Sequence, residues 1–196
     1  MTPIYMPEFV WEPSVLMNML WTDLPWENRE GAPRRECWFN PYGREYTYGS
    51  GEHARTYQAH PLDDREYFSY AIAGVMATLN HQTGASYDCC FVNGYAHGRQ
   101  HLGWHSDDSP EMDQAHPIAT VSLGAEREIW FREKPHAVLN RSESLNNESL
   151  TKITLEAGSA CIMPAGMQQT HQHRIPKSPL GDACGARISL TYRRLV

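Results

Sequence analysis

The spacing of apolar residues changes along the chain, from a helical spacing in the first part to a strand-like one after residue 86. In the first part, apolar residues recur three and four positions apart, which is typical of amphipathic helices. In the second part, several short segments are either apolar throughout or alternate with period two, as strands do. The pattern therefore predicts supporting helices first and a β-rich core after them.

Two helices are predicted. The first begins at Ser14, a residue type that caps helix N-termini, and runs through about Leu20. The second and clearer helix covers 63–82, and Gly84 ends it soon after. Its repeated stripe consists of Tyr67, Tyr70, Ala71, Gly74, Val75, Thr78 and Leu79. We expect this helix to pack on a sheet as a support, with no chemistry of its own.

The β-prone segments of the second half are short. They cover 87–94, 117–124, 127–132, 150–155, 159–163 and 186–195, with an irregular polar loop over 135–147. In the last segment, Ile188, Leu190 and Tyr192 alternate with Arg187, Ser189, Thr191 and Arg193. Seven or eight short antiparallel strands after one or two helices predict an α+β protein with a double-stranded β-helix (jelly-roll) core.

An aromatic segment over 34–51 lies between the two predicted helices. It interleaves rings with arginines: Trp38, Phe39, Tyr42, Tyr46 and Tyr48 with Arg34, Arg35 and Arg44. Tyr46 and Tyr48 are two residues apart, so an extended backbone puts both rings on one face. Two interpretations stay open: a β-hairpin whose rings pack on the core, or a stacking platform for a nucleobase with arginines nearby for phosphates.

Length and composition indicate one soluble domain. The chain has 196 residues, 41% of them hydrophobic, and no apolar run approaches the ~20 residues of a membrane span. The first ten residues carry no basic segment followed by an apolar stretch, so no signal peptide is predicted. We therefore expect a cytoplasmic protein, or one in the nucleoid or the nucleus of a eukaryote.

The charge of the chain limits the nucleic acids it can bind, and its cysteine content bears on disulfides and zinc. The net charge of −6 argues against a strong non-specific grip on duplex DNA. Lysine is rare, so nearly all positive charge is arginine, which suits a few bidentate contacts with carboxylate or phosphate. Five cysteines without a C-x-x-C spacing predict reduced, mostly buried thiols rather than disulfides or a zinc site.

The candidate chemistry begins at the run 103–108, Gly-Trp-His-Ser-Asp-Asp. His105 and Asp107 share a face if the segment is extended, and together they supply two thirds of a 2-His-1-carboxylate iron site. By itself this pair is equally consistent with a surface turn. The third ligand has two candidates in the His-rich turn 171–176, His171 and His173, and period two puts both on the same face.

Five motifs occur in one order over the C-terminal half. They are N-x-Y (93–95), G-W-H-S-D-D (103–108), P-I-A-T-V-S-L-G-A (117–125), H-R-I-P (173–176) and R-x-x-L-T-Y-R (187–193). In this order the sequence resembles the AlkB family of Fe(II)- and 2-oxoglutarate-dependent dioxygenases, the oxidative nucleic-acid demethylases. A weaker similarity, P-R-R…Y-G-R-E-Y-T-Y, lies over 33–48, where that family carries its nucleotide-recognition segment.

The resemblance implies a cofactor and its ligands. Fe(II) is expected to take His105, Asp107 and His173, with His173 preferred to His171 because a short apolar-Pro step follows it. The co-substrates are 2-oxoglutarate and O₂.

The resemblance also assigns the co-substrate contacts. Arg187 is expected to pair with the distal carboxylate of 2-oxoglutarate, since a buried anion needs a fixed cation. Arg193 is expected nearer the metal, at the other carboxylate and the reaction centre. Asn93 and Tyr95 are expected to donate hydrogen bonds to 2-oxoglutarate.

The implied reaction is decarboxylation of 2-oxoglutarate to succinate and CO₂, coupled to hydroxylation of an N-alkyl group that then leaves as formaldehyde. The target base must leave the stack to react. Tyr46 and Tyr48 are the candidates that hold it. Trp104 and Asp108 are further candidate contacts, although a place in the core is the preferred interpretation of Trp104. Relatives acting on DNA commonly carry an acidic residue after this Asp-Asp pair, whereas 109–111 reads Ser-Pro-Glu here.

The expected protein is thus a single AlkB-like domain over 1–196. It divides into a nucleotide-recognition segment (about 1–60), a support helix (about 61–84) and a jelly-roll core (about 85–196). The expected partner is alkylated nucleic acid, single-stranded or short duplex, bound by a monomer without a membrane. The alternative enzyme is a 2-oxoglutarate-dependent hydroxylase of RNA, a modified base or a protein side chain. A catalytically silent binding module or a zinc hydrolase explains the terminal arginines less well.

Overall fold

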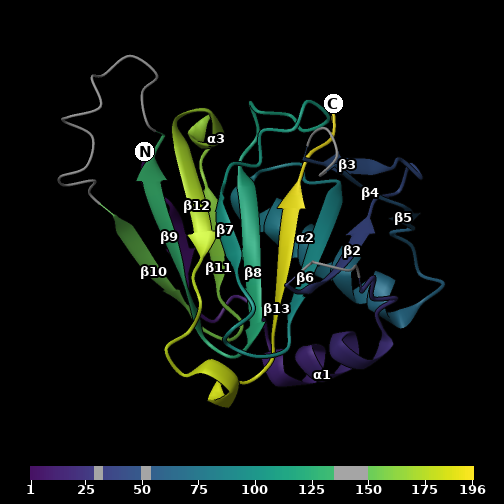
Figure 1. Ribbon diagram of the computed structural model, residues 1–196. Coiled ribbons are helices and arrows are strands. Elements are labelled where there is room, and N and C mark those ends of the chain that lie inside the picture. The colour runs from purple at the N-terminus through teal and green to yellow at the C-terminus, as the bar shows by residue number, and fades with distance from the viewer. Residues whose placement is uncertain (29–32, 50–53, 135–149) are drawn as a thin grey trace.

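A computed structural model describes residues 1–28, 33–49, 54–134 and 150–196 (Figure 1). The predicted loop over 135–147 and the last residues of the aromatic segment lie outside the described residues. Two sheets face one another, and two helices cover the outer side of the larger sheet (Figure 1).

The larger sheet, called the major sheet below, has seven strands in the order β1-β11-β8-β13-β6-β2-β5. The strands are β1 (Ile4–Met6), β2 (Arg35–Phe39), β5 (Ala59–His60), β6 (Cys89–Tyr95), β8 (Ile118–Gly124), β11 (Ala160–Met163) and β13 (Arg187–Arg193). All its pairings are antiparallel except β2 with β5.

The second sheet, the minor sheet, has the order β10-β9-β12-β7 and is antiparallel throughout. Its strands are β7 (Leu102–His105), β9 (Arg127–Glu133), β10 (Thr151–Leu155) and β12 (His171–Ile175). A hairpin of β3 (Tyr46–Tyr48) and β4 (Arg55–Tyr57) stands apart from both sheets. This arrangement confirms the predicted jelly-roll, but the segment predicted as a His-rich turn is the strand β12.

The first helix, α1 (Pro13–Asp23), begins one residue earlier than predicted and ends three residues later. Ser14 lies inside its first turn, and no side chain caps the helix. Proline fits the first helical position because its missing N–H would have no partner there. The prediction of a Ser14 cap was therefore wrong.

The second helix, α2 (Tyr67–Thr83), ends at Gly84 as predicted, in the left-handed conformation. The predicted stripe is only partly the buried face: Leu79 is fully buried, but Tyr67 is 84% exposed and Tyr70 64%. Apolar residues occur on more than one side of this helix, and the side with Ile72 and Leu79 packs on the sheet. A short helix α3 (Met167–Thr170) and a turn of 3-10 helix η2 (Gly181–Ala183) complete the described elements.

The strand β13 shows how the major sheet separates two environments. All seven of its residues are buried. Its apolar residues, including Leu190 and Tyr192, contact the core cluster that contains Leu20 of α1 and Ile72 of α2. Burial of each such side chain contributes about 1.5–3 kcal/mol. The alternating polar residues therefore face the space between the two sheets, and the polar chemistry collects there.

All five cysteines are buried and free, as predicted. No helix among the described residues is long and apolar enough to cross a membrane.

Candidate metal centre and co-substrate pocket

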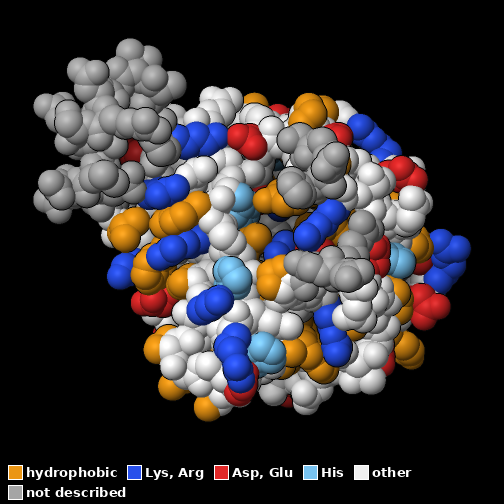
Figure 2. Space-filling view, viewed as in Figure 1, with side chains coloured by type: hydrophobic (Ala, Val, Ile, Leu, Met, Phe, Trp, Pro, Cys, Tyr) orange, Lys and Arg blue, Asp and Glu red, His pale blue; other side chains and the backbone are white. Residues whose placement is uncertain are grey.

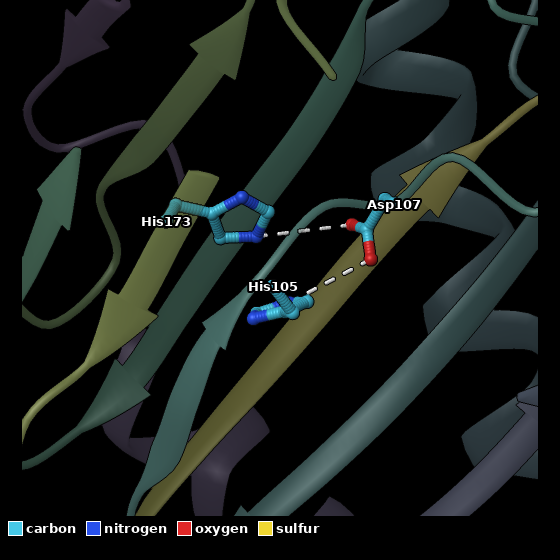
Figure 3. A group of neighbouring side chains, drawn as sticks. All are labelled: His105, Asp107 and His173. Carbon is cyan, nitrogen blue, oxygen red and sulfur yellow. Dashed lines mark ion pairs between the residues drawn. The ribbon is translucent and has the colours of Figure 1, made fainter. Parts of the chain in front are cut away.

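Two imidazoles and one carboxylate meet between the sheets (Figure 3). His105 ends β7, His173 lies in the middle of β12, and the two residues pair directly across these antiparallel strands. Directly paired residues project side by side from one face of a sheet, and the two ring centroids are 4.1 Å apart. The third residue, Asp107, follows two positions after the end of β7.

The backbone around Asp107 is held although it has left the strand. The N–H of Asp107 donates to Oε1 of Gln168 at 3.0 Å, and its carbonyl accepts from Nε2 of Gln114 at 3.1 Å. The neighbouring Ser106 hydroxyl donates to the carbonyl of His171 at 2.8 Å. Asp107 thus reaches the cluster from a fixed loop, whereas the sequence argument assumed a continuous extended strand.

The three side chains fit a small metal ion. Nε2 of His105 lies 3.7 Å from Oδ1 of Asp107, and Nε2 of His173 lies 3.9 Å from Oδ2. Metal bonds of about 2.0–2.2 Å at right angles put ligand atoms about 3 Å apart. The observed separations exceed this by less than an ångström, a distance that rotation of the side chains covers.

The protonation states also suit a metal. Nδ1 of His105 lies 2.9 Å from the carbonyl of Gly103, and since a carbonyl only accepts, Nε2 carries the lone pair that faces the cluster. Burial lowers the pKa of His105, and burial together with His105 lowers the pKa of His173 to about 3. Both imidazoles are therefore neutral at pH 7.

Asp107 stays ionised in this buried place because of Arg193. Burial acts to raise the pKa of the carboxyl, but Arg193 and the two imidazoles lower it to about 2. Nη2 of Arg193 lies 2.8 Å from Oδ1 of Asp107. The other oxygen, Oδ2, is buried and has no hydrogen-bond partner among the described residues. One carboxylate oxygen is therefore oriented by an arginine and the other remains for a metal.

His171 does not join the cluster. Its ring is half-buried, and its Nδ1 lies 2.7 Å from Oγ1 of Thr170. Of the two histidines that period two could not separate, the structure brings His173 beside His105 and Asp107.

A second buried cation, Arg187, lies on the same strand as Arg193. Arg187 has no exposed surface, and its Nε donates to Oγ of Ser122 at 2.9 Å. Its Nη1 and Nη2 have no hydrogen-bond partner among the described residues. A buried guanidinium with two unused nitrogens is costly unless an anion completes it. A carboxylate, with two oxygens, is the kind of anion that would pair with both nitrogens.

The two polar residues of β6 line the same interior. Tyr95 is buried, and its ring centroid lies 5.3 Å from Cζ of Arg187. Asn93 is buried beside the metal cluster, and its Oδ1 accepts from Nε of Arg34 at 2.6 Å.

An aromatic pocket opens on the cluster. Its cavity is small, about 20 Å³, and its walls include Tyr46, Tyr48, Phe91, His105 and Asp107. Tyr46 is 2% exposed, packs on other rings of the core, and its hydroxyl lies 3.1 Å from Oγ of Ser109. Tyr48 is half-buried and stands edge-on to the His105 ring at 6.5 Å. Tyr46 is thus both a core residue and part of the pocket wall, while stacking of a nucleobase on these rings stays a prediction.

The other two predicted substrate contacts lie outside this pocket. Trp104 lies on β7 next to His105, with the guanidinium groups of Arg132 and Arg174 over its ring at 4.3 and 4.7 Å. Asp108 is exposed, and its Oδ2 lies 2.9 Å from Nζ of Lys134.

Sequence reasoning missed a buried network on one pocket wall. Nη2 of Arg34 lies 2.5 Å from Oε1 of Glu36, and Tyr57 donates to Oε2 of Glu36 at 2.7 Å. The sequence grouped Arg34 with arginines that meet phosphate, but its guanidinium is buried and holds Asn93. The one available signal was an acidic residue, Glu36, directly before the apolar run 37–39.

Comparison with known proteins agrees with this geometry. The family described as the 2OG-Fe(II) oxygenase superfamily matches residues 16–193. The chain is 27% identical to the Alpha-ketoglutarate-dependent dioxygenase alkB homolog 3 of Homo sapiens, over 91% of this chain and 60% of that protein. It is also 27% identical to the DNA oxidative demethylase ALKBH2 of Bos taurus, over 81% of this chain and 55% of that protein.

The fold has a counterpart among solved structures. The structure of OsALKBH1 superposes with a TM-score of 0.58 at 17% identity, over 98% of this chain and 97% of that chain. The matched region covers only part of each curated relative: 60% of the human alkB homolog 3, 61% of its Bos taurus counterpart and 55% of the Bos taurus ALKBH2. Because one family matches residues 16–193 and the polar interior is built as described, the chain belongs to the 2OG-Fe(II) oxygenase superfamily; within it, the chain is similar in sequence to AlkB homologues.

Proposed function

We propose that the protein removes N-alkyl groups from bases in nucleic acid by Fe(II)- and 2-oxoglutarate-dependent oxidation. The observation that carries this proposal is an aromatic pocket whose walls include two of the three candidate metal ligands. We infer that a flat base enters between these rings with its N-alkyl group towards the metal, and that the rings move apart to admit it, because the cavity of about 20 Å³ is smaller than a base. The curated relatives include a DNA oxidative demethylase.

In this proposal His105, Asp107 and His173 hold the iron. Fe(II) with 2-oxoglutarate and O₂ supplies an oxidation that hydroxylates the N-alkyl carbon, and the product breaks down to formaldehyde and the repaired base. Arg193 orients Oδ1 of Asp107 and keeps the carboxylate ionised. This leaves Oδ2 and two neutral imidazole nitrogens as the ligand set.

Arg187, Asn93 and Tyr95 bind 2-oxoglutarate. The two unused Nη atoms of Arg187 suit a bidentate contact with the distal carboxylate. Because Arg34 donates to Oδ1 of Asn93, the amide is turned so that its Nδ2 can donate to the co-substrate. Arg193 stands at the metal end, beside Asp107.

Tyr46 and Tyr48 stack against the target base. Trp104 and Asp108 contact the nucleic-acid strand outside the pocket. The base must be unpaired to enter the pocket. A single strand or a short duplex is therefore the proposed substrate, in line with the net charge of −6. We further propose that the protein acts as a monomer, as one domain, in the cytoplasm or beside the DNA in a nucleoid or nucleus.

The test is an activity screen over oligonucleotides that carry 1-methyladenine or 3-methylcytosine, single- and double-stranded, with formaldehyde and succinate both measured. The proposal predicts that the two products rise together with a methylated single strand. Asp107→Ala abolishes both, whereas the exposed Asp64→Ala, a matched loss of one carboxylate, abolishes neither. Succinate formed without formaldehyde on every methylated strand would contradict the proposal and favour hydroxylation of a protein side chain or another modified base.

A further inference from the structure

The outer face of the minor sheet carries a row of stacked cations and rings, called the cation–ring ladder below. It consists of Lys152 on β10, Trp130 and Arg132 on β9, Arg174 on β12 and Trp104 on β7. Blue and orange side chains alternate over these strands on the left of Figure 2. The ladder faces away from the polar interior.

The distances show that the ladder is continuous. Nζ of Lys152 lies 4.1 Å from the Trp130 ring centroid, and Cζ of Arg174 lies 4.1 Å from the same centroid. Cζ of Arg174 also lies 4.7 Å from the Trp104 centroid. Arg174 is thus in contact with both rings, and Trp130 has a cation from each neighbouring strand.

The ladder shares its strands with the metal cluster. Trp104 directly precedes His105 on β7, and Arg174 directly follows His173 on β12. Successive side chains of a strand point to opposite faces, so the strands that turn the ligands inward turn Trp104 and Arg174 outward. β7 is also the edge strand of this sheet, and Leu102 and His105 of β7 line the aromatic pocket.

Two cations of the ladder, Lys152 and Arg174, lack anionic partners in the part of the chain that the structure describes. Neither Arg174 nor Lys152 has a hydrogen bond or ion pair with another described residue, and Nε of Arg174 is shut off from water. The acidic neighbour on this face, Glu128, accepts a hydrogen bond from Nε1 of Trp130 at 2.9 Å and lies beyond ion-pair distance of Lys152. In a chain of net charge −6, cations that stay unpaired and are fixed by rings are suited to an external anion.

The packing of the rings also indicates whether the ladder binds the bases or the phosphates of a nucleic acid. Because cations flank both sides of Trp130, this ring is closed to a stacking base. The nitrogens at the edges of the guanidinium and the ammonium remain, and these bind phosphate oxygens. The ligand is therefore a chain of phosphates and not a base.

We propose that the cation–ring ladder binds the phosphodiester backbone of the nucleic-acid strand whose base enters the pocket. This rests on the proposed function, since it adds a second contact for the same substrate. A strand that crosses the β7 edge meets the pocket on one side of this strand and the ladder on the other. The pocket selects a base, and the ladder holds the flanking phosphates.

The test measures the affinity for a short, unmethylated, fluorescein-labelled oligothymidylate by anisotropy, from about 50 to 200 mM salt. Each phosphate contact contributes about 0.7 to the slope of log K against log salt for a single strand. The variant R174Q/K152Q is expected to bind more weakly and to have a slope shallower by about 1.4. The control R65Q/K177Q removes the same two charges from exposed sites outside the ladder and is expected to keep the wild-type slope.

Two further measurements keep the outcome clear. K152Q alone changes an exposed side chain and is expected to lower the slope by about 0.7, which covers the case in which the double variant does not fold. Poly-glutamate of matched charge is expected to compete poorly. Slopes that stay at the wild-type value in K152Q and in folded R174Q/K152Q overturn the proposal, and so does equal competition by poly-glutamate.

The binding measurement needs no turnover and so separates the two proposals. Ladder-dependent binding without demethylation of any methylated strand refutes the proposed function alone. If the wild type demethylates a strand but the ladder substitutions leave the affinity for the oligonucleotide unchanged, only the proposal about the ladder is refuted.

Discussion

Replacing Arg187 by methionine is expected to separate the stability of the empty protein from its affinity for 2-oxoglutarate. Arg187 has no exposed surface, and its Nε donates a hydrogen bond to the hydroxyl of Ser122. Burial lowers its pKa to about 10, a sign that the charge is poorly compensated where it lies. Methionine fills similar space without a charge.

Two contributions to the free energy of unfolding of the empty variant have opposite signs. Exchanging a buried, unpaired charge for an apolar side chain is neutral or stabilising by about 1–4 kcal/mol. The Ser122 hydroxyl loses its donor, which costs about 1–3 kcal/mol. The empty Arg187→Met protein is therefore expected to unfold near the wild-type temperature. Leaving a buried carboxylate of 2-oxoglutarate without its cation costs about 3–5 kcal/mol, so its Kd rises by about 150- to 5,000-fold.

The assay is thermal unfolding with and without saturating 2-oxoglutarate and a redox-inert divalent metal, together with calorimetric titration. A ligand at a hundredfold its Kd stabilises the wild type by about 2.7 kcal/mol, and Arg187→Met is expected to lose this gain. Arg187→Lys keeps a charge without the planar pair of donors and is expected to fall between the two. A methionine variant that unfolds several degrees lower when empty, yet binds 2-oxoglutarate normally, would refute the assignment of Arg187 to the co-substrate.

Three further predictions concern the metal cluster and the pocket. Asp107→Ala is expected to keep the secondary structure in circular dichroism and to lose all succinate formation. It also leaves Arg193 buried without its ion pair, so its unfolding temperature falls; residual turnover contradicts the metal assignment. Tyr48→Ala is expected to weaken binding of a methylated single strand by about 1–3 kcal/mol at little loss of stability, whereas Tyr46→Ala also removes a core ring and costs about 3–5 kcal/mol of stability; unchanged affinity in both variants returns these rings to a structural role. The metal-free protein is expected to lose stability as the pH falls from about 6.5 towards 3, because His173 binds a proton readily only when unfolded. Urea midpoints of wild type and His173→Phe between pH 7 and 4 check this, and parallel curves would contradict it.

The sequence predicted the chemistry of this site better than its geometry. The alternation in β13 placed Arg187 and Arg193 on one face, and the structure has both in the interior between the sheets. The choice of His173 over His171 could not come from period two, which treats both alike. It depends on the register of β12 against β7, a non-local pairing that no local pattern encodes.

Features that depend on packing between distant segments were missed or misplaced. The buried face of α2 was assigned to a stripe with two exposed tyrosines, because tyrosine counts as apolar in a periodicity argument but tolerates water through its hydroxyl. The contact between Arg34 and Asn93 joins residues 59 positions apart. Trp104 was a weaker candidate for holding the base, with a place in the core preferred, but it lies outside the pocket because it directly precedes the inward-facing His105 and so points to the opposite face.

The direct pairing of His105 with His173 makes this protein unusually sensitive to changes of chain length. Inserting or deleting one residue within β7 or β12 would rotate the following side chains by half a turn, so that a ligand faces water and an indole or a guanidinium faces the interior. A change of two residues would restore the facing but displace the imidazole by about 6.6 Å along its strand. β7 already contains one extra residue between Leu102 and His105, opposite the segment from His173 to Ile175 of β12. A further change of length there would misplace His105, so length variation is expected in the connections between strands.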